Sequence, residues 1–157
     1  MPNWCKNKLS IYTTSDEQMD EFLKFVGTYD ADGNQETVFS LDNIIPMPDE
    51  LRRVQHPVTI MTQEEIDVYK EQETCDVLLN MYGVANWYDW AYENWGCKWD
   101  ICNSEITDAD NSEVYIEFDT PWGPPSEDIK LVLEARFEDI SIIWLWYEEG
   151  MQVAGYL

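Results

Sequence analysis

The strongest constraint on the fold is an order of strand, helix and strand patterns that occurs near each end of the chain. Residues 7–12 alternate polar and apolar side chains as a half-buried strand does. The segment Thr13-Thr14-Ser15 offers an N-cap for a helix of apolar periodicity that ends at Gly27. Residues 37–45 resume an extended pattern before two prolines interrupt it. The first segment therefore predicts a βαβ unit.

The second segment follows the same order. Residues 113–120 alternate as a strand, Ser126 follows two prolines and opens a helix, and residues 140–146 form an apolar strand. Residues 151–156 are expected to form a hairpin with that last strand. Two βαβ units in one small chain predict an α+β fold, a ferredoxin-like sandwich with an antiparallel sheet and both helices on one face.

Between the two units lies an insertion at about 46–112, which is longer than the connections that usually join elements in a compact domain. Residues 63–82 have helical periodicity, and residues 86–95 predict a second helix rich in aromatic side chains. A chain of 157 residues has the usual size of one domain. We therefore expect residues 1–157 to form a single domain that carries a helical insertion.

The charge of the chain is extreme. It has 32 acidic residues against 9 Lys and Arg, a formal net charge of -23, yet hydrophobic residues make up 45% of it, so it is expected to fold. A surface this negative repels nucleic acid and anionic lipid, and attracts basic protein surfaces or cations. We expect no direct nucleic acid binding and no membrane binding. The alternative is that the acidity only maintains solubility.

The sequence indicates an intracellular protein. It has no apolar run near the roughly 20 residues that cross a bilayer, and it does not begin as a signal peptide does. A cytoplasmic location is therefore expected. The four cysteines are irregularly spaced in a chain large enough to build a core without disulfides, so they are interpreted as buried thiols.

The tryptophans of the insertion and of the following strand end are the most informative local feature, because a single helix stripe cannot bury rings that point in every direction. One interpretation is that the insertion packs over the open face of the sheet and its indole N–H groups meet nearby acids. The other is that the rings form the walls of a pocket between the insertion and the sheet. The residues concerned are Trp87, Trp90, Trp95, Trp99 and Trp122.

Residues for catalysis or metal binding are few. The single histidine, His56, precedes a proline and has no local partner for a nucleophile–base arrangement. A zinc site would require the cysteines to converge, and there is no glycine-rich phosphate loop. The sequence therefore predicts no catalytic residues, no metal and no cofactor, and leaves enzymatic activity open but disfavoured.

Several blocks resemble one known family. They are Met-Pro-Asn-Trp-Cys at residues 1–5, Ile-Ile-Pro-Met-Pro at residues 44–48, Asn-Trp-Gly-Cys-Lys-Trp-Asp at residues 94–100, and Thr-Pro-Trp-Gly-Pro-Pro at residues 120–125. The chain resembles the Api92-like family, which is also described by its YubB ferredoxin-like domain. Cys97 and Gly123 stand where that family is expected to have Thr and Ser. The resemblance implies a ferredoxin-like fold and a home on phages, prophages and plasmids, but no reaction.

The leading functional hypothesis is a non-enzymatic, acidic interaction protein of a mobile element. It would act as a host-takeover or anti-defence inhibitor by occupying a basic, nucleic-acid-binding surface of a bacterial host protein, in one version as a DNA mimic. Its candidate contacts are Asp16, Glu17, Asp20, Glu21, Glu64, Glu65, Asp67, Glu71 and Glu73. The alternative is a small-molecule or peptide-binding domain, conceivably an enzyme, that uses the tryptophan pocket. The oligomeric state stays open.

Overall fold

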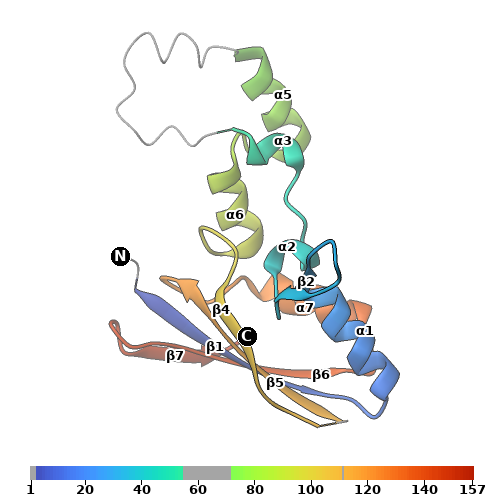
Figure 1. Cartoon of the computed structure of the whole chain (residues 1–157). Helices are drawn as coiled ribbons and strands as arrows, with labels where there is room; N and C mark the ends of the chain where they lie inside the picture. The colour runs from blue at the N-terminus through green and yellow to red at the C-terminus, as the bar shows by residue number, and fades with distance from the viewer. Residues whose placement is uncertain (1–2, 55–71, 111) are drawn as a thin grey trace.

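The computed structural model describes residues 3–54, 72–110 and 112–157. Its centre is an antiparallel sheet of five strands in the order β4-β5-β1-β6-β7 (Figure 1). The strands are β1 (Trp4–Tyr12), β4 (Cys102–Ala109), β5 (Glu113–Pro121), β6 (Ser141–Glu148) and β7 (Val153–Tyr156). The expected α+β class and the antiparallel sheet are confirmed, as is the C-terminal hairpin of β6 and β7.

Strand β1 is central and shows why the sheet has one buried face. Its side chains alternate, so that Leu9 and Ile11 are buried. Leu9 lies opposite Ile116 of β5 and Trp144 of β6, and all three side chains are almost completely buried. The polar–apolar alternation of the sequence therefore sets which face of the sheet joins the core.

Helices α1 (Asp16–Val26) and α7 (Glu127–Arg136) cover the buried face of the sheet, and Figure 1 shows both on the same side. Each begins after the expected N-cap: the Ser15 side chain accepts a hydrogen bond from the Gln18 amide, and the Ser126 side chain accepts one from the Asp128 amide. The buried apolar side chains of the two helices and of the sheet together form the core.

The segment between α1 and β4 contains a two-stranded sheet and four described helices. These elements are β2 (Thr28–Tyr29), β3 (Gln35–Thr37), α2 (Leu41–Ile44), α3 (Asp49–Arg52), α5 (Gln72–Tyr82) and α6 (Trp87–Trp95). Helix α6 agrees with the expected aromatic helix at 86–95. The expected helix at 63–82 is described from residue 72 onward, and its earlier part lies outside the described residues.

The predicted strand at 37–45 is wrong. Only its first residue belongs to a strand, and Ser40 instead caps helix α2. The Ser40 Oγ accepts a hydrogen bond from the Asn43 amide, and Leu41 and Ile44 are buried at helical spacing. In the main sheet, β4 takes the place that was expected for the strand at 37–45, although its residues were expected to belong to the insertion.

The aromatic helix does not lie over the open face of the sheet, so that interpretation is also wrong. Helix α6 contacts α3 and α7, on the helical side of the sheet (Figure 1). The Ser126 amide donates a hydrogen bond of 2.8 Å to the Trp95 carbonyl, which joins the end of α6 to the start of α7.

In the described part of the chain, no helix has both the length and the apolar composition needed to cross a bilayer.

Candidate functional site

Helices α1 and α7 bring acidic residues from distant parts of the sequence onto one side of the molecule. All four predicted acids of α1, Asp16, Glu17, Asp20 and Glu21, are exposed. Helix α7 and the turn after it add five more exposed acids that the sequence analysis did not single out: Glu127, Asp128, Glu134, Glu138 and Asp139. Their acidity was visible in the sequence, but only the fold places them beside α1. These nine residues are called the helical acidic face below.

Helices α1 and α7 carry few basic residues, and two of these already contact other groups of the protein. Compared with the nine acids of the face, the two helices have three basic residues, Lys24, Lys130 and Arg136. The Lys130 ammonium donates to the Leu157 carbonyl oxygen at 2.6 Å and lies 3.6 Å from a Glu134 carboxylate oxygen. The Arg136 guanidinium lies over the Phe25 ring, 4.2 Å from its centroid. The helical acidic face therefore keeps a strong excess of negative charge.

The second predicted acidic cluster belongs to the insertion. Glu64, Glu65, Asp67 and Glu71 lie outside the described residues, and Glu73 lies near the start of α5. This cluster therefore stays a prediction.

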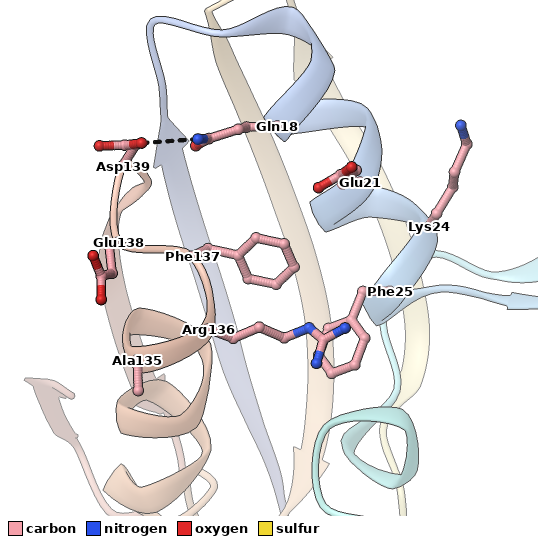
Figure 2. Close-up of a pocket in the computed structure, with 9 residues that line it drawn as sticks. All are labelled: Gln18, Glu21, Lys24, Phe25, Ala135, Arg136, Phe137, Glu138 and Asp139. Carbon is pink, nitrogen blue, oxygen red and sulfur yellow. Dashed lines mark hydrogen bonds between the residues drawn. The ribbon is translucent and has the colours of Figure 1, made fainter.

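A cleft of about 720 Å³ opens within the helical acidic face, between α1 and the C-terminal end of α7 (Figure 2). The Gln18 side-chain amide donates a hydrogen bond of 2.9 Å to Asp139 at one end of it. Arg136 lies at the other end, over Phe25, and the ring of Phe137 lies between the two ends (Figure 2). The Gln18 Oε1 atom is buried and has no hydrogen-bond partner in the described structure.

A second cavity, of about 430 Å³, lies between α6 and the α2–α3 region. Three of the five predicted tryptophans, Trp87, Trp95 and Trp99, contribute to its lining. Trp90 lies instead in the core, where it packs edge-on against Trp95. Trp122 is 44% exposed and packs beside Trp99. The structure therefore brings together part of the predicted pocket, but the cavity lies against the α2–α3 region and not, as predicted, between the insertion and the sheet.

The carboxylates of this tryptophan pocket already have protein partners. Asp100 accepts hydrogen bonds from the Ser40 hydroxyl at 2.6 Å and the Leu41 amide at 2.7 Å. The two carboxylate oxygens of Asp42 accept hydrogen bonds of 2.5 Å and 2.6 Å from the Arg52 guanidinium. The sequence hypothesis expected unsatisfied polar groups here, but these two acids instead fix the walls of the pocket.

Lys98 is the cation of the tryptophan pocket that has no carboxylate partner among the described residues. Its ammonium lies 5.2 Å from the centroid of the Trp99 ring and 5.5 Å from that of the Tyr88 ring. An opening lined by tryptophans and by one cation that has no carboxylate partner among the described residues suits a planar or aromatic ligand that carries a negative charge.

Two of the described cysteines, Cys5 and Cys97, are unsuited to nucleophilic chemistry at neutral pH. Cys5 and Cys97 are fully buried, and burial raises the pKa of the Cys5 thiol to about 11 and that of Cys97 to about 12. Both therefore remain protonated thiols. Within residues 3–54, 72–110 and 112–157, no three acidic, cysteine or histidine side chains converge as metal ligands. His56 lies outside those ranges.

The chain is similar to a curated protein in sequence and to a solved structure in fold. No family model matches the chain. The chain is 32% identical over 77 residues to the uncharacterized protein YubB of Escherichia coli K12, a match that covers 47% of this chain and 51% of YubB. The match therefore spans about half the length of this curated relative.

The crystal structure of protein api92 from Yersinia pseudotuberculosis is similar over almost the whole chain. The TM-score is 0.58 at 14% identity, and the match covers 99% of this chain and 93% of that one. At this identity the match shows a shared fold. The two proteins carry the names of the family that the sequence motifs resemble, so the resemblance to the Api92-like family is confirmed.

Proposed function

We propose that this chain is a non-enzymatic interaction protein of a mobile genetic element that occupies a basic surface of a bacterial host protein. The observation that supports it best is the helical acidic face, where nine exposed acids lie on α1, on α7 and on the turn after α7. The acids are carried by elements that are already folded before binding, and their field accelerates encounter with a basic partner. A cytoplasmic site of action in the host is part of this proposal.

The natural occupant of such a host surface would be nucleic acid. Carboxylates on the exposed turns of α1 and α7 can take the place of phosphates at a surface rich in Lys and Arg. In that case the protein acts as a DNA mimic and inhibits a defence nuclease or another nucleic-acid-binding protein. Because exposed charges are screened by salt, the complex is expected to weaken steeply as ionic strength rises.

The fold is proposed to be ferredoxin-like in its detail. Strands β1, β5 and β6 with helices α1 and α7 supply five elements of that plan, and β4 supplies the edge strand next to β5. Strand β7 extends the opposite edge. In this plan the long segment from β2 to α6 is an elaboration of the connection between α1 and the edge strand.

The test is a pull-down from bacterial lysate at low salt, followed by a salt step and mass spectrometry of the eluate. The first variant neutralises α1 as Asp16→Asn, Glu17→Gln, Asp20→Asn and Glu21→Gln. The matched control neutralises four exposed acids away from α1 and α7, as Asp32→Asn, Glu36→Gln, Glu105→Gln and Asp108→Asn. The wild type and the control are expected to retain a basic protein that the α1 variant loses.

Two results would contradict this proposal. If the wild-type protein retains no basic protein at low salt, the acidic surface has no such partner in that lysate. If both neutralised variants lose the same protein equally, net charge rather than the helical acidic face is responsible.

A second candidate function is supported by the tryptophan pocket, in which Lys98 lies beside aromatic rings. In this case the chain binds a small aromatic anion or a peptide end. Titration of aromatic carboxylates against tryptophan fluorescence, with Trp99→Leu and Lys98→Met as variants, tests it. Loss of a saturable fluorescence change in both variants would support the pocket, whereas no saturable change in the wild type would rule out this ligand class.

A further inference from the structure

We propose that the open face of the five-stranded sheet packs against the same face of a second copy of this chain. This inference goes beyond the proposed function, because it concerns the side of the molecule opposite the helical acidic face. Helices α1 and α7 lie on the other side of the sheet, and among the described residues Figure 1 shows no helix across the open face. Two sheets can pack on each other through such faces.

The register of the sheet identifies the side chains of the open face. Lys8 precedes the buried Leu9 on β1, so it points away from the core. Leu145 of β6 lies opposite Lys8, and Tyr156 of β7 lies opposite Leu145. Residues directly opposite one another share a face of the sheet. On β6 and β7 the open-face residues are therefore Ser141, Ile143, Leu145, Tyr147, Ala154 and Tyr156.

This part of the open face carries no acid, although the chain has 32 acidic residues. None of the six open-face residues of β6 and β7 is charged. The charged open-face residues of β1 are Lys6 and Lys8, and each ammonium lies 2.7 Å from a carboxylate oxygen of β5. An antiparallel sheet that faces only water has polar side chains on that face. A surface that is free of acid and carries aromatic and aliphatic side chains instead indicates a protein contact.

The open face has both a projecting ring and a recess. Tyr156 is 69% exposed and Ile143 is 48% exposed. Both line a groove of about 390 Å³, together with Tyr115 of β5 and Leu145 of β6. A two-fold interface requires one surface to supply the projections and the recesses that receive them. The exposed Tyr156 ring and the groove meet this requirement.

Electrostatics favours a second copy as the occupant of the open face. Two copies with a formal net charge of -23 each repel one another through most of their surfaces. Packing through the open faces brings strands without acids together and leaves α1 and α7 of each copy on the outside (Figure 1). A basic partner is instead attracted to the helical acidic face, and nucleic acid is repelled by the whole molecule.

The size of the open face limits the strength of this contact. Four of the five strands are eight or nine residues long. With strands about 4.8 Å apart, the projected area of the face is on the order of 600 Å² per copy. Specific interfaces bury about 800 Å² per partner. The dimer is therefore expected to be weak and reversible, with a dissociation constant of roughly micromolar size.

The experiment is sedimentation velocity of the whole protein over a concentration series, at low and at high salt. A monomer–dimer equilibrium is expected, and the dimer fraction is expected to rise with salt, because salt screens the repulsion between the two acidic copies. This salt dependence is opposite to that expected for the complex with a basic partner, so the two contacts are distinguished by the sign of the effect.

The variant Ile143→Glu is expected to remove the dimer, because it places two carboxylates in the contact. The matched control is Leu131→Glu, which makes the same kind of change at a residue of α7 that is 58% exposed, and it is expected to dimerise as the wild type does. Ile143→Thr and Tyr156→Ser are milder variants, and each is expected to weaken the dimer about tenfold, because each change occurs twice in the interface. Circular dichroism checks that every variant is folded.

Four results would overturn the dimer. They are a wild-type protein that stays monomeric at every concentration and salt, a dimer that weakens as salt rises, equal weakening by Ile143→Glu and Leu131→Glu, and a dimer unchanged in Ile143→Thr and Tyr156→Ser. If the wild type is monomeric and Ile143→Glu loses a host protein in the pull-down, the open face binds that protein and self-association is refuted.

Discussion

Replacement of Lys6 by Met is expected to destabilise the fold by about 3 kcal/mol, because it leaves a buried carboxylate without its countercharge. The Lys6 ammonium lies 2.7 Å from Asp119 Oδ1, and the Asp119 side chain is only 4% exposed. That oxygen has no other polar partner in the described structure, so Lys6 alone compensates its charge. Asn103 donates to the other carboxylate oxygen at 2.9 Å and cannot neutralise the charge.

Lys8 provides a matched control on the same strand and the same face of the sheet. Its ammonium also lies 2.7 Å from a carboxylate oxygen, but that acid is Glu117, whose side chain is 37% exposed. Water can solvate Glu117 when the lysine is removed, so Lys8→Met is expected to destabilise the fold by less than about 1 kcal/mol. The two variants change charge and side-chain length identically, and the burial of the acid distinguishes them.

Urea denaturation followed by tryptophan fluorescence measures both free energies of unfolding. The double variant Lys6→Met/Asp119→Asn is expected to recover part of the loss, since a neutral amide is less costly to bury than an unpaired carboxylate. Equal losses for Lys6→Met and Lys8→Met, or a double variant less stable than Lys6→Met alone, would refute the argument from burial.

Three further predictions concern the helical side of the molecule. Asp100→Ala is expected to reduce the free energy of unfolding by about 3 kcal/mol, because the buried Ser40 hydroxyl and the Leu41 amide both lose their charged acceptor. Urea and thermal unfolding measure the loss, and an unchanged stability would contradict the prediction. The free energy of unfolding is expected to fall by about 1.4 kcal/mol per pH unit between the unfolded thiol pKa of 9.0 and the folded Cys97 pKa of about 12. The reason is that the unfolded chain releases the Cys97 proton at a lower pH than the folded chain does. A Cys97→Ala variant that shows the same decline would contradict this prediction. Gly96→Ala is expected to lower the melting temperature strongly, because the φ angle of Gly96 is 74° and a Cβ atom there would lie 2.6 Å from the Ser126 nitrogen. An unchanged melting temperature in calorimetry would contradict this prediction.

Local patterns predicted those elements whose own residues decide their structure. The alternation in β1 and the Ser15 and Ser126 caps are properties of short segments, and the structure confirms them. The segment at 37–45 was predicted incorrectly because its deciding contact is distant in sequence. The Asp100 carboxylate accepts the Leu41 amide hydrogen bond and so stabilises the start of α2.

The candidate sites divide in the same way. The acids of α1 and the tryptophans of α6 could be named from the sequence, because charge and ring content are properties of single residues. The cleft between α1 and α7 could not, because Gln18 and Asp139 are 121 positions apart and meet only when both helices pack on the sheet. Nor could the sequence separate Trp90, which is buried, from Trp99, which lines a pocket.

The sequence by itself determined the α+β class, the antiparallel strand patterns, the acidic surface and the family resemblance, because each depends on local periodicity, composition or direct motif similarity. The tertiary structure decided which strand completes the sheet, on which side α6 packs, and which acids share a surface. These depend on contacts between distant segments, whose free energies are set by burial and geometry that no single stretch of sequence contains.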